Sequence, residues 1–563
     1  MNPNVRPPAR RGGAVLVAAL RQHGVDTVFS VPGESFLPAL DALYQARSEI
    51  RLITCRQEGA AGHMAEAYAK LTGRPGVCLV TRGPGATHAS IAVHTARQDS
   101  TPLILLVGQV SRRMLGREAW QELDIPAVFG SLTKWATQID RADRIPEIVS
   151  RAFHVATSGR PGPVVIAAPE DLLYETVEVA DAPAYRPVRT HAGAEDLARL
   201  SRMIAEAKRP IMLLGGSGWS PQAYADLQRF AERFDLPVCT GFRRQDRFDN
   251  RHPNYAGDLG IAADPALVER VRQSDLIVCV GSRMSETTTA GYTLLEVPRP
   301  RQRLVHVHPD AGELGRVYQA DLAINADLPA FAAAVAGIEA PARIPWSDRT
   351  RQARAAYEAN LAPVPMPGPV NLAEIVAHLR ERLAPDAIVT NGAGNYSGWV
   401  HRFYCYRGFR TQLAPTSGVM GYGLPAAIAA AVARPGRQIV CFAGDGCFQM
   451  SAQELATVRQ FGLKLIVIVV NNGMYGSIRM HQEVHFPGHV HGTDLQNPDF
   501  AMLARSYGLR GELVTETAAF ADAFTRALQA DVSTVLELRV DPEAITPRTT
   551  LTALRERAER SGH

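Results

Sequence analysis

Short apolar runs alternate with segments of helical periodicity along most of this chain. In residues 13 to about 180, each strand-like run precedes a stretch in which apolar residues recur every three or four positions. Continuous apolar strands are typical of parallel sheets covered by helices on both faces. The pattern therefore predicts an α/β fold with a doubly wound parallel sheet. Strands are expected at 27–31, 50–54, 76–81 and 103–107, and helices from Pro38, at 58–71 and at 86–96.

The same alternation returns twice, so we expect three domains, each a doubly wound parallel sheet: 13–180, 191–340 and 373–545. Residues 181–195 and 340–372 are rich in proline and lose the periodicity, so they are interpreted as connecting segments. Residues 546–563 are interpreted as a charged tail, helical or mobile. Strands of the second domain are expected at 210–214, 236–239, 275–280 and 303–307.

Two turns rich in oxygen ligands end neighbouring strands of the last predicted domain. Gly444-Asp445-Gly446 follows the apolar run 439–442, and Asn471-Asn472 follows the run 463–470. The segment 451–461 between them has helical periodicity, and such right-handed crossovers bring both strand ends to one edge of the sheet. One carboxylate and one amide oxygen suit Mg²⁺, which takes its other ligands from water and phosphates. Because glycines let backbone N–H groups approach phosphate, the unit predicts a diphosphate held through a divalent metal.

Size and composition narrow the classes of function. The chain of 563 residues has a formal charge of +4 and no long basic block, so nucleic acid is not an expected partner. The seven cysteines lack Cys-x-x-Cys spacing and lie mostly in or beside apolar runs, as reduced thiols of a cytosolic protein do. No apolar run reaches membrane-spanning length. Arg10-Arg11 before the run 14–20 resembles a short export signal, but the run continues into a helix-to-strand pattern, so we expect the first helix of a domain behind a basic leader.

A single glutamate, Glu58, stands at the start of the predicted helix 58–71. It directly follows a strand and a short polar turn, and the helix that it opens is lined by small apolar residues. A glutamate in the first turn commonly interacts with the helix dipole. A carboxyl in such apolar surroundings, with little counter-charge beyond Arg56, would instead exchange a proton near neutral pH. The residues alone leave both interpretations open.

Several segments together resemble the thiamine-diphosphate enzymes of the acetolactate synthase (acetohydroxyacid synthase) large-subunit family, over about residues 13–545. The resemblance implies a pyrimidine-binding, a central and a diphosphate-binding domain. It also implies an active site between the first domain of one subunit and the third of another, so a homodimer or homotetramer is expected. The segments are RQEGAAGHMAEAYAKLTG (56–73), TRGPGATHAS (81–90), GQVSRRMLGREAWQE (108–122), SGRPGPV (158–164), SGVMGYGLPAA (417–427) and the two oxygen-bearing turns.

The resemblance assigns roles to individual cofactor residues. It implies that Asp445, Asn472 and the backbone carbonyl of Met474 bind Mg²⁺, and that Glu58 hydrogen-bonds N1′ of the aminopyrimidine ring. Met420 matches the bulky side chain that wedges between the two cofactor rings, although a methionine at this position could also be ordinary core packing. Further cofactor-binding positions are expected at Gly394, Asn395, Gly418, Gly446, Cys447 and Gly476.

Other positions bear on the substrate. By resemblance, Gln121 and Lys134 line the substrate channel, as do Arg112 and Arg113, whose charges suit a carboxylate but are also compatible with a solvated surface. His481 is counted with Glu58, Gln121 and Lys134 as a catalytic candidate, because it occupies the place of a tryptophan that shapes substrate choice in the family.

The chain departs from the family pattern in places that leave the acceptor substrate open. Gln57 replaces a histidine, His88 replaces an asparagine, and the tail lacks the family's closing segment. Four histidines follow the last predicted metal ligand, but Pro487 and Gly488 separate them, so no single helix face presents all four. We expect a solvated or substrate-facing loop there rather than a transition-metal site. These histidines are His481, His485, His489 and His491.

The central domain leaves FAD binding open. Arg160 matches an arginine that contacts FAD in acetolactate synthases, and 213–218 is a fragment of a dinucleotide fingerprint. Against FAD, the segment 281–286 has lost an acidic pair, and 260–263 has lost the histidine-glycine pair of the flavin-binding stretch.

The resemblance predicts a cytosolic transferase/lyase that depends on thiamine diphosphate and Mg²⁺. It would decarboxylate a 2-oxo acid such as pyruvate and pass the two-carbon unit to a second 2-oxo acid. A simple 2-oxo acid decarboxylase or an aldehyde-forming carboligase is an alternative. A non-catalytic assembly partner is a further one, although the presence of Glu58, Asp445 and Asn472 argues against it. The sequence does not decide whether a regulatory small subunit binds.

Overall fold

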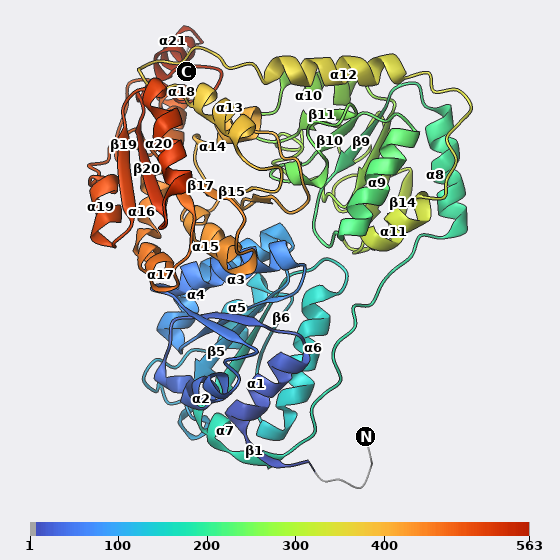
Figure 1. The fold of residues 1–563 in the computed structure, drawn as a ribbon. Helices are drawn as coiled ribbons and strands as arrows, with labels where there is room; N and C mark the ends of the chain where they lie inside the picture. Colours follow the sequence, from blue (N-terminus) through green and yellow to red (C-terminus); the bar gives the residue numbers. More distant parts are fainter. Residues whose placement is uncertain (1–6, 562–563) are drawn as a thin grey trace. The chain divides into compact units, whose positions relative to one another are not determined.

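The computed structural model describes residues 7–561 and contains, within them, three six-stranded sheets with flanking helices (Figure 1). The chain divides into two compact units, Met1–Val188 and Arg189–His563. The first unit holds one of these sheets and the second unit holds the other two. The predicted fold class, α/β with three doubly wound parallel sheets, is confirmed. The domain limits inside the second unit stay a prediction.

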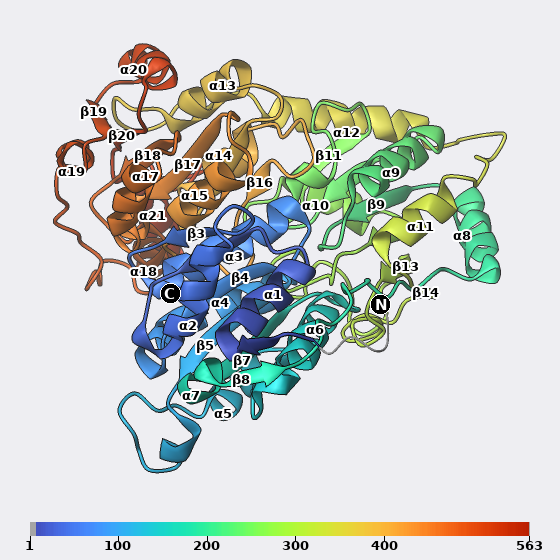
Figure 2. The ribbon, with the colours of Figure 1, turned by 60° about the horizontal axis from the view of Figure 1, so that its bottom comes forward.

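The sheet of the first unit has the strand order β3-β2-β4-β5-β7-β6, and every neighbouring pair is parallel. Helices α1, α2 and α6 share an apolar core on one face, while α3 and α4 pack together on the other (Figure 2). All strands and helices predicted in this region are present within a few residues of their expected bounds. The strands are β2 (Thr27–Ser30), β3 (Arg51–Thr54), β4 (Gly76–Val80), β5 (Leu103–Gln109), β6 (Trp135–Gln138) and β7 (Pro163–Pro169); the main helices are α1 (Gly12–Gln22), α2 (Leu37–Gln45), α3 (Glu58–Thr72), α4 (Gly83–Asp99) and α6 (Ile145–Thr157).

Helices α3 and α4 approach each other closely because glycines of α3 face the contact. A Cβ atom added to Gly62 would lie 2.5 Å from the Cβ of Ala92, and one added to Gly59 would lie 3.0 Å from Cγ2 of Ile91. Close-packed interiors leave no room for such additions, so one helix would have to shift. The small residues thereby set the spacing of the helix pair that carries Glu58 on α3 and His88 on α4.

We predict that Gly62→Ala destabilises the protein by roughly 1–3 kcal/mol, because the new methyl group overpacks the contact with Ala92. The check is thermal unfolding, in which the variant should melt at a lower temperature than the wild type. The double variant Gly62→Ala/Ala92→Gly removes the Cβ of Ala92 that the new methyl group would meet, so it should recover most of the lost stability. A single variant as stable as the wild type would contradict the close contact.

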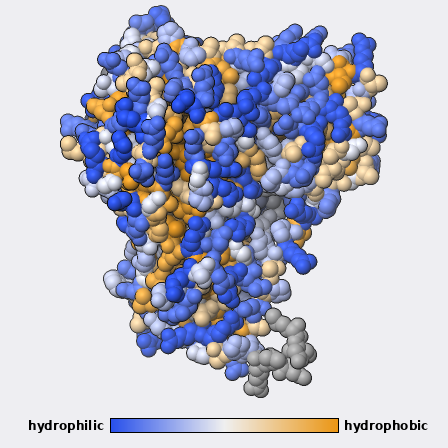
Figure 3. All heavy atoms as spheres, in the orientation of Figure 1, coloured by the Kyte–Doolittle hydropathy of each residue, from blue (hydrophilic) through white to orange (hydrophobic). Residues whose placement is uncertain are grey.

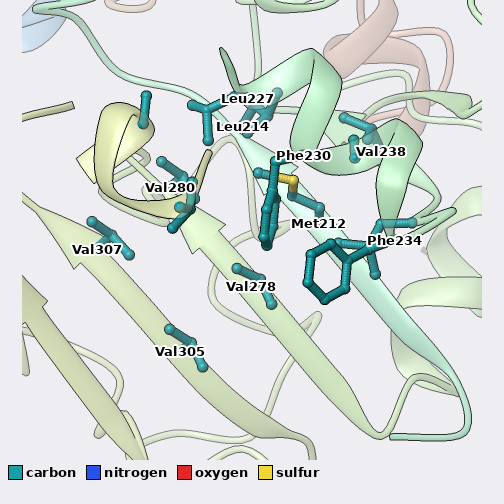
Figure 4. Close-up of a cluster of buried hydrophobic side chains, with 14 of the residues drawn as sticks. Met212, Leu214, Leu227, Phe230, Phe234, Val238, Val278, Val280, Val305 and Val307 are labelled. Carbon is teal, nitrogen blue, oxygen red and sulfur yellow. The ribbon is translucent and has the colours of Figure 1, made fainter. Parts of the chain in front are cut away.

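The first sheet of the second unit has the order β11-β10-β9-β12-β13-β14 and is parallel throughout. Phe230 and Phe234, at the end of α9, lie over Met212 and Val278 in its core (Figure 4). The strands are β9 (Pro210–Leu214), β10 (Val238–Thr240), β11 (Tyr255–Asp258), β12 (Leu276–Val280), β13 (Arg303–His308) and β14 (Leu322–Asn325); the helices are α8 (Ala194–Glu206), α9 (Pro221–Arg233), α10 (Pro265–Arg272) and α11 (Leu328–Val335).

The second sheet of this unit has the order β16-β15-β17-β18-β20-β19 and is also parallel. The predicted strand–helix–strand unit is present, with α16 and α17 between β17 and β18. The strands are β15 (Ile388–Asn391), β16 (Gln412–Leu413), β17 (Ile439–Gly444), β18 (Ile466–Asn471), β19 (Arg510–Val514) and β20 (Thr534–Arg539); the helices are α13 (Leu372–Arg382), α14 (Ser397–Phe403), α15 (Gly423–Ala433), α16 (Asp445–Gln449), α17 (Leu455–Gln460), α18 (Gly476–His485), α19 (Phe500–Ser506), α20 (Thr517–Gln529) and α21 (Leu551–Arg560).

The segment 340–372, which was interpreted as a connecting segment, contains a helix that the sequence analysis did not predict, α12 (Ser347–Asn360). Trp346, directly before this helix, is fully buried, and its Nε1 donates to the backbone carbonyl of Phe234 at 3.0 Å. Tyr357 packs edge-on against Tyr255 of β11, with ring centroids 4.9 Å apart. Most positions of α12 are polar or alanine, so the apolar periodicity that marks other helices is weak here.

Hydrophilic side chains cover most of the face seen in Figure 3, and apolar side chains gather between them in patches. Large apolar side chains that stay exposed within the described residues include Trp120, Ile478 and Phe486. All seven cysteines are buried and unpaired, as expected of reduced core residues. No helix in residues 7–561 is both long and apolar enough to cross a membrane.

Candidate cofactor and metal site

The oxygen-bearing turns lie side by side, as the strand–helix–strand pattern predicts. Gly444 at the end of β17 is paired with Val470 near the end of β18, so Asp445 and Asn472 leave the same edge of the sheet. Asp445 is 3% exposed, and its carboxylate accepts the backbone N–H of Gly446 and of Gly473, each at 2.9 Å. Burial raises the pKa of this carboxyl, and its hydrogen bonds act in the opposite direction.

Asn497, which the sequence analysis missed, ties the two turns together. Its Nδ2 donates to Oδ2 of Asp445 at 2.8 Å and to Oδ1 of Asn471 at 2.9 Å. Gln449 in turn donates to Oδ1 of Asn497 at 2.8 Å. Asn497 lies in the loop before α19, far along the chain from either turn, and no local pattern marked it.

A cavity of about 630 Å³ opens beside these turns, and it is lined by residues of both sheets of the second unit. Its walls include the metal candidates Asp445, Asn472 and Met474. The cofactor positions proposed from the sequence also line it: Gly394, Asn395, Gly418, Met420, Gly446, Cys447 and Gly476. The structure therefore brings together all the residues proposed for the diphosphate half of the site.

The turns around this cavity have the conformations that bring backbone close to a ligand. Gly394 has φ +140° and Gly418 has φ +67°, values that favour glycine. Asn395 accepts a hydrogen bond from Ser477 Oγ at 2.8 Å, which joins its turn to the start of α18. Met420 is partly buried and packs against the core of the C-terminal sheet.

Helix α18 begins at the cavity, and its first turn is a suitable place for phosphate. Gly476 is its first residue, so the N–H groups and the positive end of the helix dipole lie at the wall of the cavity. Met474 precedes it, and its N–H donates to Oδ1 of Asn472 at 3.3 Å. The donor set of one carboxylate, one amide oxygen and one carbonyl fits Mg²⁺. No group of three or more His, Cys, Asp or Glu suited to a metal occurs within the described residues.

The C-terminal helix α21 is clamped onto α18 (Figure 1). Glu483 of α18 is fully buried, and Arg555 of α21 donates to both of its carboxylate oxygens, at 2.7 and 2.6 Å. Arg479 donates to the same carboxylate at 3.0 Å. The hydrogen bonds from Arg555 are the main cause that lowers the pKa of Glu483 to about 2. Leu551 and Ile545 add an apolar contact with Met474.

We predict that Glu483→Gln lowers the free energy needed to detach α21 by roughly 3 kcal/mol at neutral pH, because two arginines lose their buried partner. Hydrogen exchange of residues 551–560 should accelerate in the variant. Since the pKa of Glu483 is lowered in the folded state, its contribution to stability is complete above the ordinary pKa near 4.5 and fades as pH falls towards 2. The difference in stability of α21 between wild type and variant should therefore become smaller over that pH range.

The exposed pair Glu556–Arg560 on the same helix provides a matched control, because its nitrogen and oxygen are 3.8 Å apart and open to solvent. Glu556→Gln should leave the exchange of α21 nearly unchanged. Equal acceleration in both variants would show that general charge loss, not the buried clamp, holds the helix.

The catalytic candidate Glu58 lies in the first unit, where it is paired with His88. Nδ1 of His88 is 2.8 Å from Oε2 of Glu58, and the Glu58 side chain is 14% exposed. The sequence analysis named only Arg56 beside this carboxyl and missed the hydrogen bond with a histidine on the neighbouring helix. Gln57 caps α3 by accepting the N–H of Ala60 at 2.8 Å, so Glu58 is not the capping side chain.

The other candidates of the first unit have varied surroundings. Gln121 has a left-handed φ of +65°, and its carbonyl accepts the N–H of Gly83, the first residue of α4, at 2.9 Å. Lys134 donates to the carbonyl of Ser158. Arg112 donates to Asp171 at 2.9 Å and is also paired with Glu175, so it is part of a local ion-pair network, whereas Arg113 is exposed.

The expectation of a histidine loop was wrong in part, because α18 extends to His485. His481 and His485 are both exposed on this helix and stack with ring centroids 6.1 Å apart. His489 and His491 follow the helix. His481 is not among the residues that line the cavity, whereas Ile478 and Met480 of the same helix are.

Arg243 is a further cavity residue that the sequence analysis missed. It follows β10, is 4% exposed and has φ +56°, an uncommon conformation for a side chain of this size. Its guanidinium donates to the carbonyl of Pro415 at 2.5 Å and to Ser397 Oγ at 3.3 Å. It thereby joins the central sheet to two turns at the cavity wall. Since no apolar or glycine pattern surrounds it, only the fold identifies it.

Comparison with known proteins places this geometry in a family. Models described as thiamine pyrophosphate enzyme, N-terminal TPP binding domain, central domain, and C-terminal TPP binding domain match residues 10–128, 197–335 and 392–538. The acetolactate synthase large subunit of Parasynechococcus marenigrum is 36% identical over 95% of this chain and 88% of its own length. The chain belongs to the acetolactate synthase large-subunit family of thiamine pyrophosphate enzymes.

Two further members of the acetolactate synthase family extend the comparison. The acetolactate synthase large subunit of Corynebacterium glutamicum is 31% identical, over 96% of this chain and 88% of its own length. The acetolactate synthase isozyme 2 large subunit of Escherichia coli is 32% identical, over 94% of this chain and 95% of its own length. The protein is therefore an enzyme with domains that bind thiamine diphosphate, and the cavity is lined by residues of its C-terminal TPP binding domain and its central domain.

Proposed function

We propose that this enzyme decarboxylates a 2-oxo acid such as pyruvate and transfers the two-carbon unit to a second 2-oxo acid, as an acetolactate synthase does. The observation that carries the proposal is the joint presence of Asp445 and Asn472 at one sheet edge and of Glu58 at the start of α3. The near full-length similarity to acetolactate synthase large subunits supports the reaction class.

The C-terminal sheet would hold the diphosphate. Asp445, Asn472 and the carbonyl of Met474 would be the protein ligands of Mg²⁺, an ion that takes its remaining oxygen ligands from phosphate and water. Backbone N–H groups of Cys447 and of the start of α18 would donate to the phosphate oxygens, and Gly446, whose N–H is bound by Asp445, would let the backbone approach them closely. Met420 packs against the cofactor rings, and Asn497 keeps the Asp445 carboxylate in place.

Glu58 would hold and move a proton at N1′ of the aminopyrimidine. The chemistry that thiamine diphosphate supplies when bound is attack on a keto carbon and acceptance of the electron pair released with CO₂. The first unit of one subunit would face the cavity of another subunit, so a homodimer would be the smallest complete enzyme. A homotetramer would contain two such dimers. Gln121, Lys134 and His481 would line the approach of the substrate.

FAD has no part in the proposed reaction. Arg160, the residue matched to flavin contact, donates to Ser100 Oγ at 2.9 Å and to the carbonyl of Arg97 at 2.5 Å within its own unit. The central sheet also lacks the residues of the flavin-binding stretch at 260–263 and 281–286. The fit to FAD is therefore poor, and a colourless purified enzyme is the expected result. A cytoplasmic location and a regulatory small subunit are part of the proposal only by analogy with the family.

We predict acetolactate as the product when the enzyme is supplied with pyruvate, thiamine diphosphate and Mg²⁺. Acetaldehyde as the main product would favour the alternative of simple decarboxylation, and mixed hydroxyketones formed with added aldehydes would favour an aldehyde-type carboligase. A screen of other 2-oxo acids as second substrate defines the acceptor. Absence of all these products under saturating cofactor would refute the proposed function and favour a non-catalytic assembly partner.

We predict different defects for the two halves of the site. Asp445→Asn removes the one carboxylate among the proposed metal ligands, so Mg²⁺-dependent binding of thiamine diphosphate, measured by calorimetry, should be lost. Glu58→Gln should still bind the cofactor but lower turnover by about 10²-fold or more. Unchanged activity of Glu58→Gln would contradict its catalytic role.

A further inference from the structure

A histidine contacts the proposed catalytic carboxyl, and no resemblance to the family assigns it a role. His88 lies in the second turn of α4, and its Nδ1 is 2.8 Å from Oε2 of Glu58. We propose that His88 is a positioning residue, which holds one carboxyl oxygen of Glu58 so that the other faces the ring nitrogen of the cofactor. This inference rests on the proposed function.

The local fold prepares this contact. Because Gln57 caps α3, the carboxyl of Glu58 is not drawn to the N–H groups of its own helix. It lies instead against the first turn of α4, where a Cβ added to Gly85 would be 3.6 Å from its Oε1. The close packing of the two helices brings the backbone carbonyl of His88 within 3.1 Å of where a Cβ of Gly59 would be. The packing therefore fixes the backbone of His88 beside the start of α3, from which its imidazole reaches Glu58.

The two carboxyl oxygens have different surroundings. Oε2 is engaged by the imidazole, whereas Oε1 lies 3.6 Å from the position that a Cβ of Gly85 would take. A glutamate has three rotatable bonds, and a hydrogen bond from a fixed partner selects one orientation of its carboxyl in advance. Partners that orient a reacting group in this way commonly change affinity or activity by 10–100-fold when removed.

A purely structural role fits the exposure poorly. The His88 side chain is 59% exposed, and pairs that are this open to solvent contribute little to folding stability. Loss of the imidazole should therefore leave the fold of the single subunit intact and act through Glu58. His94 lies on the same helix and is also exposed, which makes it a matched control.

The test compares His88→Leu, His88→Asn and His94→Leu in the full-length enzyme. Asparagine keeps a donor near the position of Nδ1, whereas leucine keeps only volume. Thermal unfolding verifies the fold of each variant. The near-ultraviolet circular dichroism of bound thiamine diphosphate, recorded without substrate, reports the tautomeric and protonation state of the aminopyrimidine. Turnover with pyruvate is measured separately.

We expect His88→Leu to melt like the wild type, to shift the balance of the circular dichroism bands, and to lose at least about 10-fold in turnover. His88→Asn should stay within about 3-fold of the wild type, and His94→Leu should match it. The inference is overturned if His88→Leu keeps both the bands and the turnover, or if His88→Asn fails as badly as His88→Leu. A wild type that binds no thiamine diphosphate would instead overturn the proposed function itself.

Discussion

The parallel register of β17 and β18 is the constraint on which the candidate site depends. Because Gly444 is paired with Val470, the residues that follow the two strands emerge at one edge, and a single carboxylate can be combined with an amide from the next strand. Neither turn could hold a divalent ion alone, since each supplies too few oxygens. The apolar character of both strands, which buries them between helices, thus fixes the position of the polar chemistry at their ends.

Each half of the proposed active site is built from local contacts of its own unit. The cavity, the oxygen-bearing turns and the start of α18 belong to the second unit, and their hydrogen bonds close among residues of that unit. Glu58, Gln57 and His88 belong to the first, where the spacing of α3 and α4 is decided by glycines. Each half is thus held in place by its own unit, so little free energy is needed to order either half when the proposed active site is assembled.

Short-range patterns in the sequence were sufficient to predict the strands, most helices and the meeting of two strand ends. Apolar runs located the strands, and the helical segment between two of them was enough to bring Asp445 and Asn472 together. The sequence analysis missed Asn497 and the contact of His88 with Glu58, because each joins residues that are distant in the chain and has no pattern of its own. The helix α12 escaped for the opposite reason: its few buried residues, such as Trp346, lie among polar and proline-rich neighbours. His481 was singled out by position in the family, yet its side chain lies outside the cavity wall.

The ion pair between Glu483 and Arg555 connects helix α21 to the helix that begins beside the proposed metal-binding turn. Helix α18 starts two residues after Met474 and contains Glu483, and Ile545 and Leu551 share an apolar cluster with Met474. Free energies of two such events on one element are coupled reciprocally. A ligand at the start of α18 that favours the docked tail would, by the same reciprocity, bind more tightly by the same factor when a partner holds the tail docked.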